Sequence, residues 1–141
     1  MKAFFDTSVL VPVYYGDHEH HDRSMRVFRD FTQAQASCGA HSLAEVYSSL
    51  TRMPGRDRIS AEQAILFVDD LRDRLTVVSL TADEHAQGLR KYAAMGIVSA
   101  TIYGALLAHC ALKTRAEEIY SWNTRHYEQF GPEVAARLTT P

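Results

Sequence analysis

The chain has 141 residues, of which 46% are hydrophobic and 23% charged, values that are ordinary for a globular domain of this length. Its formal net charge of −2 supplies no general attraction to nucleic acid, so any contact with RNA or DNA must come from a local patch. Because no apolar run approaches the roughly 18 residues of a membrane span, and residues 1–15 lack a basic start followed by a cleavage site, we expect one soluble, cytoplasmic domain over residues 1–141 with no membrane partner.

Short β-rich segments alternate with segments of helical periodicity along the chain. In order, we expect a strand at 2–5, a helix from Val9, a helix at 19–33, a strand at 35–38, a helix at 42–52, a helix at 60–75, a strand at 76–80, a helix at 81–94, a helix at 100–114 and a strand at 118–122. Ser60 and Thr81 are the expected N-caps of two of these helices. This alternation predicts an α/β fold built from βα units around a parallel sheet.

The two cysteines, Cys38 and Cys110, stand far apart and neither has a second metal-type ligand at a typical spacing. We expect two buried reduced thiols; the alternative is a disulfide between them.

Two acids and an amide occupy positions that suggest a site. Asp6 follows the first strand, Asn123 follows the expected strand at 118–122, and Glu45 lies in a helical stretch that is otherwise mostly apolar or small. Open α/β sheets place ligand crevices at the carboxyl ends of their strands. The sequence therefore predicts a carboxylate pocket for a hard divalent cation, and with it phosphodiester chemistry. For Glu45 the alternative is a capping box with Ser42 as N-cap.

Three segments together resemble the PIN domain and, within it, the VapC-type toxin ribonucleases of bacterial toxin–antitoxin pairs. They are residues 4–10 (FFDTSVL), residues 43–52 (LAEVYSSLTR) and residues 102–127, which include IYGALLA and SWNTRHY. The resemblance implies a three-layer α/β/α sandwich with a central parallel sheet of four or five strands. It also implies three or four acidic positions that hold Mg²⁺ or Mn²⁺ at the strand ends.

The sequence departs from this family pattern at Gly104, where the resemblance implies an acid, usually aspartate. Asn123 stands at a fourth position that is often aspartate, so only Asp6 and Glu45 remain of the usual acids. Glycine inside a helix costs about 1 kcal/mol relative to alanine. Our hypothesis is that the parent gene encodes aspartate at position 104 and that this chain is an impaired form; the alternative is a close helix-packing contact at Gly104.

Other polar groups give weaker signals. The run from Asp17 to Asp22 contains three histidines, but an exposed helix start explains it better than a zinc site. Thr7 and Ser8 could serve the metal water or a phosphate, or could cap the helix from Val9. Several basic side chains could contact RNA phosphates or simply be solvated: Arg52, Arg56, Arg58, Arg125 and His126.

The sequence therefore predicts a metal-dependent endoribonuclease toxin. Asp6 and Glu45 would hold the metal, and Asn123 would orient a water molecule as a third catalytic residue. The resemblance implies an RNA substrate, a small cognate antitoxin and a homodimer. The alternative is a non-catalytic PIN module that binds antitoxin or RNA; DNA cleavage is disfavoured because the chain is small and carries no further domain.

Overall fold

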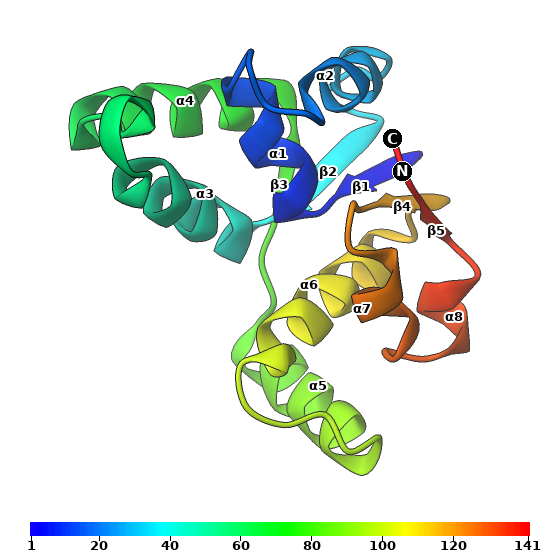
Figure 1. Cartoon of the computed structure of the whole chain (residues 1–141). Coiled ribbons are helices and arrows are strands. Elements are labelled where there is room, and N and C mark those ends of the chain that lie inside the picture. The colour runs from blue at the N-terminus through cyan, green and yellow to red at the C-terminus, as the bar shows by residue number, and fades with distance from the viewer.

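The computed structural model describes residues 1–141 and centres on a five-stranded, wholly parallel sheet (Figure 1). The strands are β1 (Ala3–Phe5), β2 (Ala36–Gly39), β3 (Thr76–Val78), β4 (Glu118–Tyr120) and β5 (Leu138–Thr139). Their order across the sheet is β3-β2-β1-β4-β5. The predicted parallel sheet of four or five strands is confirmed.

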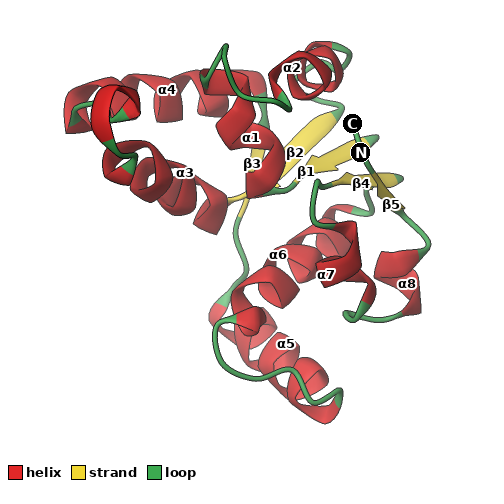
Figure 2. Cartoon of the chain, viewed as in Figure 1, coloured by secondary structure: helices red, strands yellow, loops and turns green.

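Helices cover both faces of the sheet (Figures 1 and 2). One layer contains α1 (Thr7–Tyr14), α2 (His21–Arg29), α3 (Ala40–Arg52) and α4 (Ala61–Arg74), with the short 3₁₀ turn η1 (Gly55–Asp57) between the last two. The other contains α5 (Ala82–Ala94), α6 (Thr101–Thr114), α7 (Thr124–Glu128) and α8 (Pro132–Ala135). The chain thus forms the expected three-layer α/β/α sandwich. No helix combines the length and the apolar character that crossing a bilayer requires.

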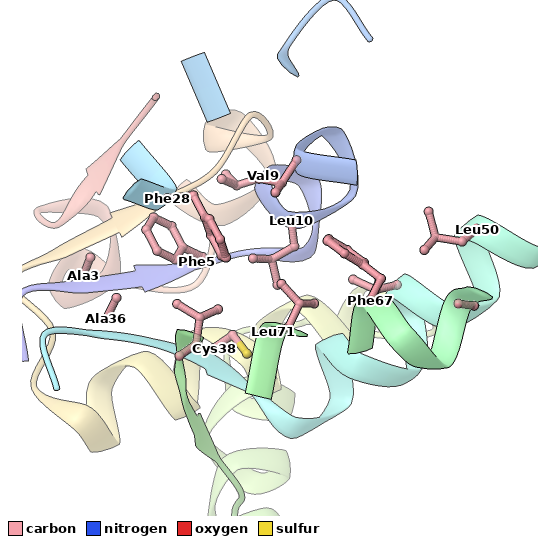
Figure 3. Packing of buried hydrophobic residues seen from close by; sticks show 14 residues of the cluster. Ala3, Phe5, Val9, Leu10, Phe28, Ala36, Cys38, Leu50, Phe67 and Leu71 are labelled. Carbon is pink, nitrogen blue, oxygen red and sulfur yellow. The ribbon is translucent and has the colours of Figure 1, made fainter. Parts of the chain in front are cut away.

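The hydrophobic core lies in two clusters, one on each face of the sheet. Successive side chains of a strand point to opposite faces, so in β1 Phe5 enters the first cluster while Phe4 enters the second. Figure 3 shows Phe5 beside Phe28, with Leu10 of α1 and Leu71 of α4 in the same cluster. Both Phe residues of β1 are fully buried, so this short strand is fixed from both sides.

Most of the predicted elements are present, and their ends are where sequence and structure differ. Ser60 and Thr81 cap α4 and α5 through capping boxes with Gln63 and Glu84, as expected for the caps. The last part of the chain contains three elements that were not predicted: α7, α8 and β5. They have five residues, four residues and two residues, which is too short for hydrophobic periodicity to indicate them.

Both cysteines are buried and free. Burial is the main cause that raises the pKa of the Cys38 thiol to about 12 and that of the Cys110 thiol to about 11. Both sulfurs are therefore neutral thiols at physiological pH and serve as small apolar core groups.

Candidate active site

Asp6 lies where β1 ends and α1 begins. β1 and β4 pair in register, with Phe5 opposite Tyr120, and the Asp6 amide donates to the Tyr120 carbonyl over 3.0 Å. Asp6 is also the N-cap of α1, because its side chain accepts from the Ser8 amide at 3.3 Å. The helix α1 therefore begins at Thr7, two residues earlier than expected. The prediction that Thr7 or Ser8 caps this helix is wrong, because its N-cap is Asp6.

Four donors hold the Asp6 carboxylate, which is only 5% exposed. Besides the Ser8 amide, Oδ2 accepts from the hydroxyls of Ser8 at 2.6 Å and Ser121 at 2.9 Å. Oδ1 accepts from the Tyr127 hydroxyl at 2.5 Å. Burial, followed by the charge of Asp6, raises the pKa of Tyr127 well above its ordinary value, so the phenol keeps the hydrogen it donates. The carboxylate is thus fixed in a single orientation.

Glu45 reaches the same region from α3. Its Oε1 lies 3.2 Å from the Thr7 hydroxyl and 4.0 Å from His41 Nε2 one turn earlier. Burial is the main cause that raises the pKa of Glu45; His41 and Thr7 oppose the rise, and the negative charge of Asp6 adds to it. The two acids therefore interact electrostatically, as expected of carboxylates that share a site.

The capping-box interpretation of Glu45 is wrong. The N-cap of α3 is Gly39, and Ser42 lies inside the helix. The buried Ser42 hydroxyl is instead 2.9 Å from the Thr7 hydroxyl. Glu45 therefore has no part in starting its helix.

Asn123 follows β4, as Asp6 follows β1. Its side chain makes no capping hydrogen bond to α7, and its backbone amide donates to Ser121 Oγ at 2.9 Å. A cavity of about 440 Å³ brings the expected residues together; its polar and small lining includes Asp6, Thr7, Ser8, Glu45, Ser49, Gly104, Asn123 and His126. All three residues assigned to the site from the sequence thus line one cavity at the carboxyl edge of the sheet.

Gly104 lies on α6 at the wall of this cavity. A Cβ atom built there would lie 2.9 Å from His126 Nε2 and 3.3 Å from Phe130 Cζ. The position where the resemblance implies an acid is therefore a close contact between α6 and the segment from His126 to Phe130. The close packing contact at Gly104, the alternative to the impaired-site hypothesis, is present in the structure, and no carboxylate enters the cavity from α6.

The donor set of the cavity fits a hard divalent cation. Asp6 and Glu45 supply carboxylates, and Asn123, Thr7 and Ser8 supply neutral oxygens. Mg²⁺ prefers oxygen ligands, keeps several waters and typically takes one or two protein carboxylates. No group of three or more His, Cys, Asp or Glu side chains is arranged to hold a metal anywhere in the chain, so the two acids would be the only charged protein ligands.

Of the other polar groups singled out from the sequence, Thr7, Ser8 and His126 line this cavity, whereas the remaining ones lie outside it. Arg52 lines a smaller hollow that also includes Glu45. His20 stacks on Trp122 at 3.7 Å, and His21 Nδ1 is 2.7 Å from the Pro12 carbonyl, so these histidines hold the segment before α2 in place. Glu84 completes the capping box of α5 and pairs with Lys113, away from the cavity.

The sequence did not indicate Ser121 and Tyr127 as parts of the site, although both donate to Asp6. They lie in the SWNTRHY segment, so their proximity to a strand end was visible. Their bonds to Asp6, however, span 115 and 121 residues of sequence. The SWNTRHY segment thus indicated that Ser121 and Tyr127 lie near the site, but it did not indicate that both side chains bind Asp6.

Comparisons with known proteins agree with this architecture. A family model of the PIN domain matches residues 3–129. Ribonuclease VapC27 of Mycobacterium tuberculosis is 31% identical over 112 residues, which make up 79% of this chain and 78% of the relative.

Two solved structures share the fold over almost their whole length. VapC20 of Mycobacterium tuberculosis, described as a sarcin-ricin loop cleaving toxin, gives a TM-score of 0.71 at 16% identity over 89% of this chain and 92% of its own. VapBC2 of Rickettsia felis, bound to a DNA fragment from its promoter, gives 0.66 at 14% identity over 99% and 98%. At such identities the likeness establishes the fold alone.

Proposed function

The chain belongs to the PIN domain family, among the VapC-type toxin ribonucleases, and from this we propose that it is a metal-dependent endoribonuclease, the toxin of a toxin–antitoxin pair. The observation that supports this best is the cavity at the carboxyl edge of the sheet, which Asp6, Glu45 and Asn123 all line. Carboxylates that line one cavity repel one another, and a bound cation would offset this repulsion.

Asp6 and Glu45 would hold the cation, Mg²⁺ or Mn²⁺. When bound, such an ion polarises the phosphoryl group, makes water more acidic and neutralises charge on the leaving oxygen. Ser8, Ser121 and Tyr127 keep the Asp6 carboxylate turned in one direction. The Asn123 amide, which makes no capping bond, orients the water that attacks the phosphate.

We further propose that Gly104 weakens this site. With no carboxylate from α6, the cation has two charged ligands instead of three, and it is held less firmly. A parent sequence with aspartate at position 104 would supply the third.

The proposed partners are an RNA substrate, a small cognate antitoxin that covers the acidic cavity, and a second copy of the chain, all in the cytoplasm. Complexes such as VapBC2 among the structural neighbours support an antitoxin partner. A non-catalytic module that binds antitoxin or RNA is the second candidate, and the observation in its favour is the missing acid at Gly104.

Cleavage of structured RNA separates the two candidates. We expect the purified chain to cut RNA with Mg²⁺ or Mn²⁺ and to stop when EDTA is added. Asp6→Asn and Glu45→Gln should each abolish cutting, while Glu117→Gln, at an exposed acid paired with Lys2, should have no effect. RNA that is bound but left intact under all conditions would favour the non-catalytic module.

A further inference from the structure

His126 lies in the space that any side chain at position 104 would need. Its Nε2 atom is 2.9 Å from the Cβ position of Gly104, and its Cδ2 atom is 3.4 Å away. Real Cβ contacts are essentially never as short as the first of these distances. The absence of a side chain at Gly104 therefore has a second consequence besides the missing carboxylate. It leaves space for the His126 imidazole to lie against α6 at the wall of the acidic cavity.

His126 is an exposed residue, and its imidazole contacts three neighbours in the segment that follows it. Its ring meets Phe130 edge-on at 5.3 Å and Tyr127 at 6.0 Å, and both of these aromatic side chains are almost fully buried. The Gln129 side-chain amide lies 3.5 Å from Nδ1 and donates to the His126 carbonyl at 2.8 Å. A donor beside Nδ1 favours the tautomer that carries its hydrogen on Nε2, the ring atom nearest to the Cβ position of Gly104.

The cavity has hydroxyl donors on its serine, threonine and tyrosine residues but no strongly basic side chain to face an anionic substrate. Its lining contains two carboxylates but no lysine or arginine, and only Asn123 and His126 bring side-chain N–H groups. A phosphodiester entering the cavity needs hydrogen-bond donors on its non-bridging oxygens. His126 is the residue whose position depends on Gly104.

A role as a metal ligand does not fit His126. A cation held by His126, Asp6 and Glu45 together would need those three groups to converge, and no such convergence of three ligating side chains exists in the chain. The imidazole lies on the wall where the substrate would pass and not within the metal-holding pair.

We propose that His126, seated against the bare backbone of Gly104, is a substrate-contacting catalytic residue that donates from Nε2 to a non-bridging oxygen of the scissile RNA phosphate. This role rests on the proposed ribonuclease function and adds a residue to it. The contact strengthens as negative charge grows on the phosphate during attack, so it acts on kcat more than on KM.

The test measures kcat and KM on an RNA hairpin that carries a cleavage site mapped with the unmutated chain. His126→Leu, which fills the same space without a nitrogen, should lower kcat about tenfold to a hundredfold, as expected for a hydrogen bond to a charged group. His126→Gln keeps an N–H donor and should recover part of that loss. His85→Leu, at an exposed histidine on α5 outside the acidic cavity, is the matched control and should cut normally.

Two further variants separate chemistry from folding. His126→Ala leaves an open space beside Gly104, so added imidazole should restore part of the activity, whereas His126→Leu should not respond. Gly104→Ala should also lower kcat, because its methyl group displaces the imidazole, with little change in melting temperature.

The outcomes distinguish this role from the proposed function. If the unmutated chain cuts no RNA with either cation, the ribonuclease function fails and the role of His126 fails with it. If the chain cuts RNA but His126→Leu keeps kcat within about twofold, only the role of His126 is overturned. A loss in His126→Ala that neither imidazole nor the glutamine variant restores would show a structural role and would likewise overturn the proposal.

Discussion

Tyr127 donates its hydroxyl hydrogen to Asp6 Oδ1 over 2.5 Å and so ties α7 to the end of β1. Tyr127 is 2% exposed and Asp6 5%, so water competes weakly for this bond. The acid proposed to hold the cation is thus oriented by a residue from the far end of the chain. In metal sites, such supporting partners set the direction of the ligand and the affinity of the ion.

Replacing Tyr127 by phenylalanine tests this support. We expect Tyr127→Phe to lose about 1.5 to 3 kcal/mol of unfolding free energy, the value of a hydrogen bond to a charged group, and to bind Mn²⁺ about tenfold more weakly. Urea unfolding and metal titration give the two numbers. Tyr120→Phe, which removes a hydroxyl bonded to Glu118 outside the cavity, is the control; equal losses in both variants would contradict the special role of Tyr127.

The two acids should respond differently to neutralisation in the metal-free protein. The pKa of Glu45 is raised, chiefly by burial, so its charged form is disfavoured in the folded state. The cost of the charged Glu45 side chain to folding stability is fully present above its folded-state pKa. This cost disappears as pH falls below the pKa of the same group in the unfolded chain. Glu45→Gln should therefore be more stable than the unmutated chain at pH 7.5, and the difference should vanish in acid.

Asp6→Asn should instead be destabilising, because an amide presents only one acceptor oxygen to the serine and tyrosine hydroxyls that now converge on two. Urea unfolding of both variants at pH 7.5 and near pH 4.5 checks the pair of expectations. A stabilised Asp6→Asn would mean that charge repulsion outweighs the lost hydrogen bonds.

Substitution of Gly104 by aspartate tests whether this chain is an impaired form. Gly104→Asp should bind Mg²⁺ more tightly and cleave faster than Gly104→Ala, since it adds a third carboxylate at the cavity wall. Because the new Cβ also displaces His126, Gly104→Ala is the matched control: it fills the same space without adding a charge. Calorimetric titration that finds equal Mg²⁺ affinity in the two variants would refute the impaired-site hypothesis.

The buried thiols predict an alkaline loss of stability. Between pH 9.0, the ordinary thiol pKa, and the folded values of about 12 for Cys38 and about 11 for Cys110, the unfolded chain loses protons that the folded chain retains. Unfolding free energy should therefore fall as pH rises through this window. Urea unfolding at pH 8 and pH 10.5 should show that the free energy of unfolding falls less in a Cys38→Ala, Cys110→Ala double variant than in the unmutated chain. Equal falls in the two proteins would mean that other groups cause the effect.

The proposed homodimer can be tested on α5, α6 and the loop between them. Four large apolar side chains are exposed there: Leu89, Met95, Val98 and Tyr103. We expect sedimentation at tens of micromolar to show a dimer, with more than about 1,000 Å² buried in total. Val98→Lys should dissociate it, whereas Leu66→Lys, at an equally exposed position on α4, should not; a monomer before any mutation would end the proposal.

Local sequence determined several of the helix starts. Ser60 and Thr81 start their helices by bonds to residues three positions away, and such short-range patterns can be read without a structure. The placement of Asp6 and Asn123 at one edge followed from the same logic, because parallel strands end on the same side of a sheet. The catalytic roles of Asp6, Glu45 and Asn123 stay predictions.

Tertiary structure decided which groups those residues meet. No pattern near Asp6 could show that Ser121 and Tyr127 would hold its carboxylate, or that Gly104 would leave room for His126. These contacts depend on how α6 and α7 pack beneath the sheet (Figure 1). The sequence by itself determined the family, the strand ends and the acids, since these follow from local chemistry. The orientation of each side chain was decided by packing between segments far apart in the chain, which no local pattern encodes.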